Sequence, residues 1–337
     1  MSVNIDSIGP RVGRDEWDYG FQAALVRSME TTFITEANFA DMAAAQDVRE
    51  AIDCISTSTY RFAATDSASV ETTLLEARSA LRSFFRETAR GTAIEGLPEI
   101  EADMSNLRLA VRRFAAGRNI GDDYGTEGSV RAEEFERIFE SDDYCDLPAH
   151  FRDALESALL LYYDTKDIRS IDLAIDAVEF ARTAALAADA ELVFLADINR
   201  VRVDLVNIGM LLRVKYAGSE EEPPFIEGGF VDIDKLRGAL YQSFDVFDQV
   251  FYSTIYEVLV VSSVHYLMDN DSFVRFEALC ERFLSTCCKL SSSVTAGLQP
   301  LIAYYYCKQL EIRRLRIVLS AKRNGLDSKL IAERLGV

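Results

Sequence analysis

Apolar positions recur along most of the chain with the period of an α-helix. Leu155, Leu159 and Tyr162 lie at i, i+4 and i+7, and Phe247 and Phe251 are again four residues apart. Residues at this spacing share one face of a helix. No stretch shows convincing alternation of apolar and polar residues, which a half-buried strand would require. The pattern predicts an all-α fold with more than about 60% helix, well above the usual third.

Two polar segments interrupt the helical pattern. Residues 117–128 are rich in Gly and Asp, and residues 217–224 end in two prolines. Gly and Pro punctuate helices, and acidic runs remain solvated, so both segments are predicted to be connections. They divide the chain into three pieces of similar length. We therefore predict three helical repeat units over residues 1–122, 123–220 and 221–337.

A short polar motif supports the repeats. Residues 103–112 and 204–213 both read Asp-x-x-Asn-(Leu or Ile)-x4-Arg and begin 101 residues apart. A degraded third copy begins at Glu311 and has Arg314 at the Asn position. The acidic residue and the Asn are one turn apart and share a helix face. Each piece also opens with two apolar residues five apart, namely Ile34 and Phe39, Val130 and Phe135, and Val231 and Leu236.

Acidic positions upstream of the motif also recur. Ile171-Asp172-x-x-Ile175-Asp176 has a counterpart in Phe276-Glu277-x-x-Cys280-Glu281, and Val70-Glu71-x-x-Leu74 precedes the first copy of the motif. We predict that the repeated polar residues line a central cavity on long helices. The alternative is that they tie helices together within each unit. The candidate residues are Arg27, Glu30, Asp103, Asn106, Arg112, Asp204, Asn207, Arg213, Glu311 and Arg314.

Net charge narrows the class of partner. The 337 residues include 36 basic and 55 acidic side chains, a formal net charge of −19. A surface this acidic repels phosphate backbones and anionic lipid head groups, which argues against nucleic acid as a partner.

The longest apolar runs fall short of the roughly 20 residues of a membrane span. Because the N-terminus also lacks the apolar core of a signal peptide, we expect a cytoplasmic protein.

Two local features carry expectations about packing. The aromatic run Tyr304-Tyr305-Tyr306 fans around a predicted helix and indicates a helix enclosed on several sides. Trp17 is expected to pack the start of the first helix against the rest of the domain.

Residues 308–334 hold eight basic and three acidic residues, whereas residues 131–156 hold three basic and nine acidic. This asymmetry predicts that different parts of the chain meet different partners.

The sharpest candidate for metal chemistry is the DDxxD run of Asp142, Asp143 and Asp146. Carboxylates one turn apart can bridge Mg²⁺ ions that hold a diphosphate. The partner motif should end in a Glu, but the nearest match, which begins at Asn270, has Ala278 there. The run also lies in a strongly acidic segment, where a solvated loop is the simpler interpretation.

Other chemical motifs are weaker. His150 and His265 have no Cys or carboxylate at ligand spacing, so each is expected to be a partly exposed structural histidine. The six cysteines have no metal or redox spacing and are expected to be buried free thiols. The sequence has no phosphate-binding glycine loop and no nucleophile elbow. We therefore predict no catalytic residues, cofactor or metal.

Residues 300–335 contain, in order, Pro300-Leu-Ile-Ala-Tyr304, Glu311, Leu315-Arg316 and Lys322-Arg-Asn-Gly325. This region resembles the C-type subunit of the prokaryotic V/A-type rotary ATPases. In that family the region reads Pro-Leu-x-Ala-(Tyr or Phe), an acidic residue, Leu-Arg and Lys-x-Asn-Gly before a final short helix, and residues 300–335 follow this order. The Arg-x-Met-Glu of residues 27–30 and the Asp-x-x-Asn-Ile of residues 204–208 also match family motifs. Arg314 departs from the pattern, because the family usually has Asn there. The likeness covers essentially the whole chain.

The resemblance implies a non-catalytic rotor component of the central stalk. Three helical units in a pseudo-threefold, funnel-like arrangement would receive the central axle, made of D- and F-type subunits, at one mouth. The other mouth would sit on the cytoplasmic face of the membrane proteolipid ring, without inserting into lipid. The protein would act as a monomer within a larger V-type ATPase or ATP synthase complex and transmit torque for proton or sodium ion transport. Its eukaryotic counterpart would be the d-type subunit of the vacuolar ATPase.

Two other classes of function remain open from the sequence. A generic helical scaffold with another partner would keep the repeats but not the terminal resemblance. A diphosphate-dependent helical enzyme would depend on Asp142, Asp143 and Asp146 alone.

Overall fold

The computed structural model describes residues 9–121, 124–125, 127–141, 144, 147–219 and 221–337. The fold is 70% helical, and the described residues contain no strand. The predictions of an all-α fold and of more than 60% helix are therefore confirmed. The run of Asp142, Asp143 and Asp146, together with Cys145, lies outside the described residues.

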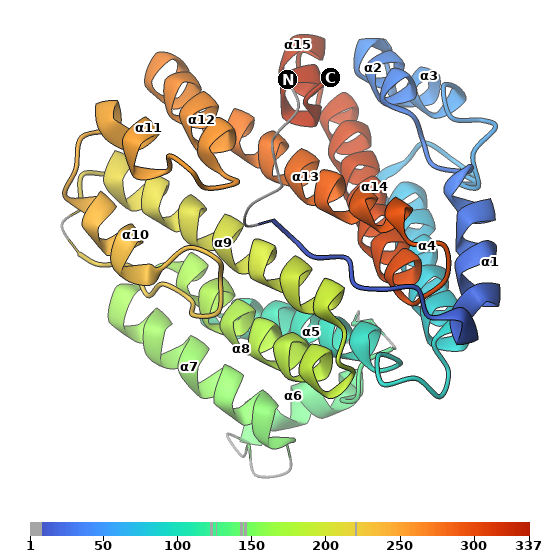
Figure 1. The fold of residues 1–337 in the computed structure, drawn as a ribbon, viewed down its shortest axis with the longest axis horizontal. Helices are drawn as coiled ribbons and strands as arrows, with labels where there is room; N and C mark the ends of the chain where they lie inside the picture. The colour runs from blue at the N-terminus through green and yellow to red at the C-terminus, as the bar shows by residue number, and fades with distance from the viewer. Residues whose placement is uncertain (1–8, 122–123, 126, 142–143, 145–146, 220) are drawn as a thin grey trace. The chain divides into compact units, whose positions relative to one another are not determined.

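Helix bounds follow the chain from N- to C-terminus (Figure 1). The α-helices in the described part of the chain are α1 (Gly20–Glu30), α2 (Glu36–Ala44), α3 (Val48–Asp53), α4 (Ser67–Thr88), α5 (Leu97–Ala115), α6 (Ala132–Ser141), α7 (Ala149–Thr165), α8 (Ile168–Asp189), α9 (Val193–Tyr216), α10 (Ile233–Leu240), α11 (Phe247–Val250), α12 (Glu257–Asn270), α13 (Val274–Lys289), α14 (Gln299–Arg323) and α15 (Ser328–Leu335). Short 3-10 helices cover Trp17–Tyr19, Phe244–Val246 and Leu290–Ser293.

The chain forms two compact units. The larger unit comprises Met1–Leu81, Arg200–Pro223 and Gly229–Val337, and the smaller comprises Arg82–Asn199 and Pro224–Gly228. The long helices α4 and α9 each contribute residues to both units. The division into three sequential units and their pseudo-threefold, funnel-like arrangement remain predictions.

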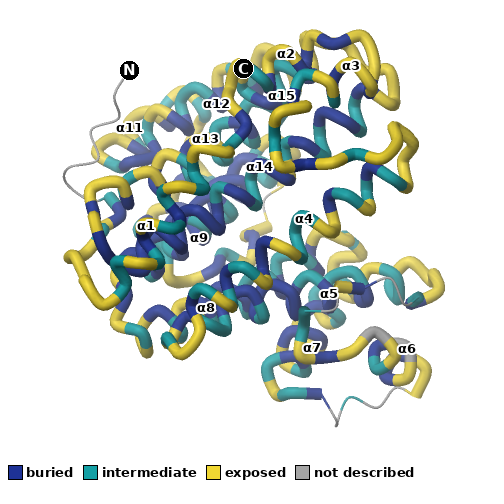
Figure 2. The backbone as a smooth tube through the Cα atoms, turned by 90° about the vertical axis from the view of Figure 1, so that its right-hand side faces the viewer, coloured by how far each residue is buried: buried dark blue, intermediate teal, exposed yellow. Residues whose placement is uncertain are grey.

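Helix α14 forms the core of the larger unit. It begins with Pro300 in its first turn, where the missing N–H costs nothing, and ends with Lys322 and Arg323, whose charges suit a helix C-terminus. Most of its length is buried (Figure 2). It packs against α1, α2, α3, α13 and α15. Tyr304, Tyr305 and Tyr306 are all buried, which confirms that this helix is enclosed on several sides.

The smaller unit is built from α5, α6, α7 and α8. Helix α8 packs against both α5 and α7. Aromatic rings from α6 and α7 meet in its core, where the ring centres of Phe135 and Phe151 are 6.2 Å apart. Tyr124, in the connection before α6, packs on Phe135 with ring centres 4.9 Å apart. The aromatic rings therefore hold the connection against the helices.

The predicted connections lie between helices. Residues 117–128 separate α5 from α6, and residues 217–224 separate α9 from α10. The expectation for Trp17 is wrong, because 73% of its surface is exposed. Trp17 belongs to the 3-10 turn before α1, and a turn residue ahead of an amphipathic helix need not share the buried face of that helix.

Candidate functional site

Glu311 on α14 is a buried carboxylate with three donors. It accepts hydrogen bonds from the backbone N–H of Ile34 at 2.7 Å and from the hydroxyl of Tyr60 at 2.8 Å. The ammonium of Lys308, one turn earlier on α14, also donates to it. Burial, followed by the charge of Glu311, raises the pKa of Tyr60 and keeps its hydroxyl protonated as a donor. Glu311 thus fastens the segment before α2 to the centre of α14.

Asp204 on α9 makes the equivalent contacts. Its carboxylate accepts from the N–H groups of Phe230 at 2.8 Å and Val231 at 3.1 Å, just before α10. The hydroxyl of Tyr256 donates to it at 2.7 Å. Burial raises the pKa of Asp204 to about 6, although these three hydrogen bonds act in the opposite direction. A Cβ on Gly229 would lie 2.0 Å from Asp204 Oδ1, so the backbone approaches as closely as it does only because this residue is Gly.

Asp103 on α5 makes the third such contact. It accepts from Ser129 through the backbone N–H at 2.6 Å and the hydroxyl at 2.9 Å, just before α6. Arg182 Nη1 and His150 Nε2 lie 3.6 and 3.8 Å from Asp103 Oδ2. Burial and the nearby Arg182 lower the pKa of His150, and Asp103 opposes them. A side chain in place of Gly128 would put its Cβ 2.8 Å from Asp103 Oδ1.

The three carboxylates therefore make equivalent contacts. Each lies on a long helix and accepts a hydrogen bond from the backbone just before a short helix. Asp103 and Asp204 bind the segment that opens the next piece of the chain, whereas Glu311, in the last piece, binds the opening of the first. We call these three contacts the acidic anchors. They recur in the order in which the motif recurs in the sequence.

The residue one turn after each acid has a less uniform role. Asn106 donates to Gly125 O at 2.8 Å and accepts from Gly125 N at 2.9 Å. Asn207 is buried. Arg314, which replaces the Asn in the third copy, makes two hydrogen bonds to Glu36 at 2.8 and 2.7 Å and lies over the Phe39 ring. These hydrogen bonds lower the pKa of Glu36, against the effect of burial.

The arginines at the end of the motif form ion pairs with the recurring acids upstream. Arg112 pairs with Asp172, and Arg213 Nη2 lies 3.4 Å from Glu277 Oε1. The third copy has Ser320 at the position of this arginine, and Arg316, at the position of Arg108 in the first copy, pairs with Glu71 at 2.7 Å. These ion pairs are partly exposed, so each contributes about 0–1 kcal/mol. They link neighbouring helices but contribute less to stability than the acidic anchors do.

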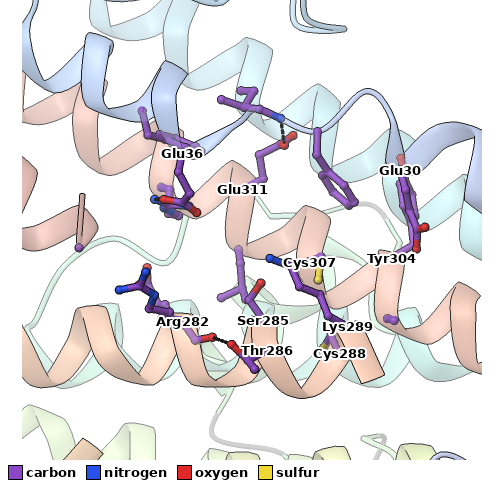
Figure 3. Close-up of a pocket in the computed structure, with 18 of the residues that line it drawn as sticks. Glu30, Glu36, Arg282, Ser285, Thr286, Cys288, Lys289, Tyr304, Cys307 and Glu311 are labelled. Carbon is purple, nitrogen blue, oxygen red and sulfur yellow. Dashed lines mark hydrogen bonds and ion pairs between the residues drawn. The ribbon is translucent and has the colours of Figure 1, made fainter. Parts of the chain in front are cut away.

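The structure brings four of the predicted residues to one pocket in the larger unit. A cavity of about 560 Å³ lies between the α1–α2 connection, α13 and α14, and its lining includes Arg27, Glu30, Glu311 and Arg314 (Figure 3). Arg27 pairs with Glu30 at 2.7 Å and donates to Ser291 O. The other predicted residues, Asp103, Asn106, Arg112, Asp204, Asn207 and Arg213, do not line this pocket. The central cavity inferred from the sequence remains a prediction.

The remaining candidates for chemistry are His265, Asp271 and the cysteines. His265 is exposed, and Asp271 caps the end of α12 in a left-handed conformation and accepts from Tyr216. Cys287 and Cys288 are buried and Cys54, Cys280 and Cys307 are partly buried free thiols. Among the described residues, no cluster of His, Cys, Asp and Glu could hold a metal ion. In the same part of the chain no helix combines the length and apolarity needed to span a bilayer.

Sequence reasoning missed the tyrosines and glycines of the anchors. Tyr60 follows Ile34 by 26 residues and Tyr256 follows Val231 by 25, but Leu155 and Glu156 stand at these spacings after Val130, so the tyrosines do not form a repeat in the sequence. It also missed Lys322, whose buried ammonium donates to Ala43 O at 2.6 Å and to Ser328 Oγ at 2.9 Å. Nothing in the local pattern marks this lysine as internal.

Comparison with known proteins identifies the family of the chain. The model of the ATP synthase (C/AC39) subunit family matches residues 23–334. The C-type subunit of the V-type sodium ATPase of Enterococcus hirae is 20% identical over 92% of this chain and 96% of its own length. The C-type subunit of the A-type ATP synthase of Methanobrevibacter smithii is 23% identical over 70% of this chain and 66% of its own length. That of Desulfurococcus is 30% identical, but the match covers only 44% of this chain and 41% of the relative.

The family match runs through all three copies of the motif and through each segment that the acidic anchors bind. The resemblance inferred from the sequence is therefore confirmed. The chain belongs to the ATP synthase (C/AC39) subunit family.

Proposed function

We propose that this protein is a non-catalytic part of the central rotor of a V/A-type ATPase. It joins the central axle, made of D- and F-type subunits, to the membrane proteolipid ring and transmits torque between them. The motion of the rotor is coupled to the transport of protons or sodium ions. The protein acts as a monomer within the complex, peripheral to the cytoplasmic face of the membrane. Membership of the family supports this proposal.

The single observation that carries the proposal furthest is the recurrence of the acidic anchors. A torque adaptor must resist shear between its parts, and that requires a specific contact wherever one repeat meets the next. Buried hydrogen bonds to a carboxylate are directional and costly to break, at about 1.5–3 kcal/mol each. The third anchor joins Glu311 to Ile34, so the last piece of the chain is fastened to the first. Such a set of links suits a part that carries load rather than substrate.

Net charge indicates which partner surfaces suit the chain. The formal charge of −19 favours basic loops on a partner and disfavours anionic lipid. We therefore expect contacts with the ring to be made through its loops. Contacts of this kind are weakened by salt, because exposed charges are screened within about 8–10 Å at moderate ionic strength.

Assembly from purified parts tests the proposal. The full chain is mixed with the D- and F-type axle subunits of the same complex and with the proteolipid ring in detergent, and the mixture is separated by gel filtration. We expect a species that contains all the components, and we expect the axle and the ring not to comigrate when this chain is left out. Raising the salt concentration should release the chain from the ring. A chain that binds neither the axle nor the ring would contradict the proposal and favour a scaffold with another partner.

A further inference from the structure

The pocket of the larger unit holds more positive charge than its own acids neutralise. Its lining includes four acidic and four basic residues. Each acid already has a basic partner: Glu30 pairs with Arg27 at 2.7 Å, Glu36 with Arg314 at 2.7 Å, Glu281 with Arg334 at 3.2 Å, and Glu311 with Lys308. Lys308 and Arg334 come from outside the lining, so two of the lining cations, Arg282 and Lys289, are left over.

Arg282 and Lys289 make no ion pair or side-chain hydrogen bond within the described part of the chain. Acidic partners are not scarce, because the chain has 55 acidic and 36 basic side chains. Lys289 ends α13, where a positive charge also suits the helix dipole. Arg282 lies in the middle of α13 and gains nothing from the helix end. The two cations therefore indicate a negatively charged group that the described chain does not supply.

Both cations lie on the same face of α13. Arg282, Ser285 and Lys289 follow one another at i, i+3 and i+7, which brings Ser285 between the two cations. Figure 3 shows the side chains of Arg282 and Lys289 extending from α13 into the pocket. Thr286 shares this face, but its hydroxyl already donates to Arg282 O at 2.8 Å. Seven residues of helix span about 10.5 Å, a distance that two long side chains can bridge toward one ligand.

A second wall of the pocket is aromatic. Phe33, in the α1–α2 connection, and Tyr304, on α14, both line the pocket, and their ring centres are 5.3 Å apart. Leu310 adds apolar surface to the lining. The volume of about 560 Å³ is within the range of small-molecule sites. A ligand held by the two cations can therefore rest an apolar part against these rings.

We propose that this pocket binds a small soluble phosphate monoester with an apolar or aromatic substituent. A phosphate monoester carries about −1.5 to −2 charges at pH 7, which matches two unpaired cations, whereas a carboxylate matches only one. The guanidinium of Arg282 offers a planar fork to two phosphate oxygens, and Lys289 offers a point charge. The net charge of −19 disfavours a phosphate on the surface of an anionic membrane. This inference does not depend on the proposed rotor function, because the pocket lies within one unit of the chain.

Calorimetric titration with phenyl phosphate tests the site. The folded full-length chain is titrated at pH 7 and low salt with phenyl phosphate and, separately, with inorganic phosphate and with benzoate. We expect one phenyl phosphate to bind per chain. Inorganic phosphate, which lacks the ring, and benzoate, which carries one charge, should each bind about tenfold more weakly. Absence of phenyl phosphate binding, or equally tight binding of benzoate, would overturn the proposal. Binding to phosphatidic acid vesicles but not to phenyl phosphate would assign the phosphate to a lipid and overturn the soluble ligand.

Charge-removing variants locate the binding. Arg282→Gln and Lys289→Gln change exposed positions, and their folding is checked by circular dichroism. Each should weaken the binding of phenyl phosphate by about tenfold or more. The matched control is Arg275→Gln, which removes the same charge from α13 outside the lining and should change the affinity by less than about twofold. Unchanged affinity of the Arg282 and Lys289 variants, or equal effects of all three variants, would overturn the assignment of the site.

Acetylation of the wild-type chain provides a readout that needs no variant. A bound anion favours the protonated, unreactive form of a neighbouring amine, so saturating phenyl phosphate should slow the acetylation of Lys289 about fivefold. Lys329, an exposed residue of α15 outside the lining, should react at an unchanged rate. Peptide mapping by mass spectrometry measures both rates. Equal acetylation of Lys289 with and without phenyl phosphate would overturn its place in the site.

Discussion

The carboxylate of Glu311 accepts a hydrogen bond of 2.7 Å from the backbone N–H of Ile34. This contact joins two residues 277 positions apart, and it has the same form as the contacts made by Asp204 and Asp103 with segments much closer in sequence. The motif that repeats in the sequence therefore makes the same kind of contact in each of its three copies. Its last copy binds the first piece of the chain.

Removal of the charge at Glu311 should destabilise the chain strongly. Glu311→Gln leaves the buried ammonium of Lys308 without its carboxylate and replaces an acceptor with a donor near Ile34 and Tyr60. Breaking a buried pair of this kind costs about 3–5 kcal/mol. Urea unfolding followed by circular dichroism measures the change. Glu30→Gln, in a partly exposed pair with Arg27, is the control and should cost less than about 1 kcal/mol. Equal effects of the two variants would argue against the anchor.

Two glycines of the larger unit should respond in opposite directions to alanine. A Cβ at Gly229 would lie 2.0 Å from Asp204 Oδ1, so Gly229→Ala must displace the backbone that Asp204 binds. We expect a loss of about 1–3 kcal/mol, the usual range for overpacking. Gly238 lies within α10 and a Cβ there would meet nothing within 4 Å. Gly238→Ala should therefore stabilise the chain by about 0.4–1 kcal/mol. Thermal unfolding of the two variants and of the wild type measures these changes in stability. Destabilisation by both variants would count against a specific contact at Gly229.

The buried Asp204 should make stability depend on pH. Its pKa is raised from 3.8 to about 6 in the folded chain, so the folded state holds this proton more tightly than the unfolded state. The corresponding contribution is fully present below about pH 4 and is lost as the pH rises through about 6. A shift of this size corresponds to about 3 kcal/mol. The measurement is the free energy of unfolding of wild type minus that of Asp204→Asn from pH 4 to 7. The subtraction removes the contribution of the other carboxylates to the pH dependence. A difference in free energy that does not fall with rising pH would refute the assignment of the raised pKa to Asp204.

Lys322 should hold α2 and α15 to the end of α14. Its ammonium donates to Ala43 O and Ala45 O, at the C-terminal end of α2, and to Ser328 Oγ at the start of α15. Lys322→Met leaves those buried carbonyls without a charged donor, at a cost of about 1.5–3 kcal/mol. Amide hydrogen exchange should rise in α2 and α15 first. Lys329→Met, at an exposed position, should change stability by less than about 0.5 kcal/mol. If exchange in α2 is unaffected by Lys322→Met, this role for Lys322 is wrong.

Much of the fold could be predicted because the helical period is strong along the chain. The two interruptions, the buried tyrosines of α14 and the recurring acidic positions all follow from local pattern and residue type. Asp103 and Asp204 could be singled out because a polar residue on an otherwise apolar helix must find a partner. The sequence could not tell which backbone groups they bind, because a hydrogen bond to a main-chain N–H leaves no mark on the residue that donates it.

Charge patterns were harder to interpret than apolar ones. The basic residues between 308 and 334 suggested a surface for a partner, but Lys308 and Lys322 are buried and bind groups of the same chain. A count of charges cannot separate a solvated lysine from one that satisfies helix carbonyls. Arg314 is a similar case, because its partner Glu36 is 278 residues away. Such pairs depend on tertiary packing, which no local window contains.

The most direct test of the proposed rotor role compares hydrolysis with transport. A complete complex, and the same complex lacking only this protein, are reconstituted into vesicles, and ATP hydrolysis and ion uptake are measured on each. The account predicts that the soluble head without the protein still hydrolyses ATP, while ATP-driven ion uptake falls to background and returns when the purified protein is added. Undiminished ion uptake without the protein would contradict it.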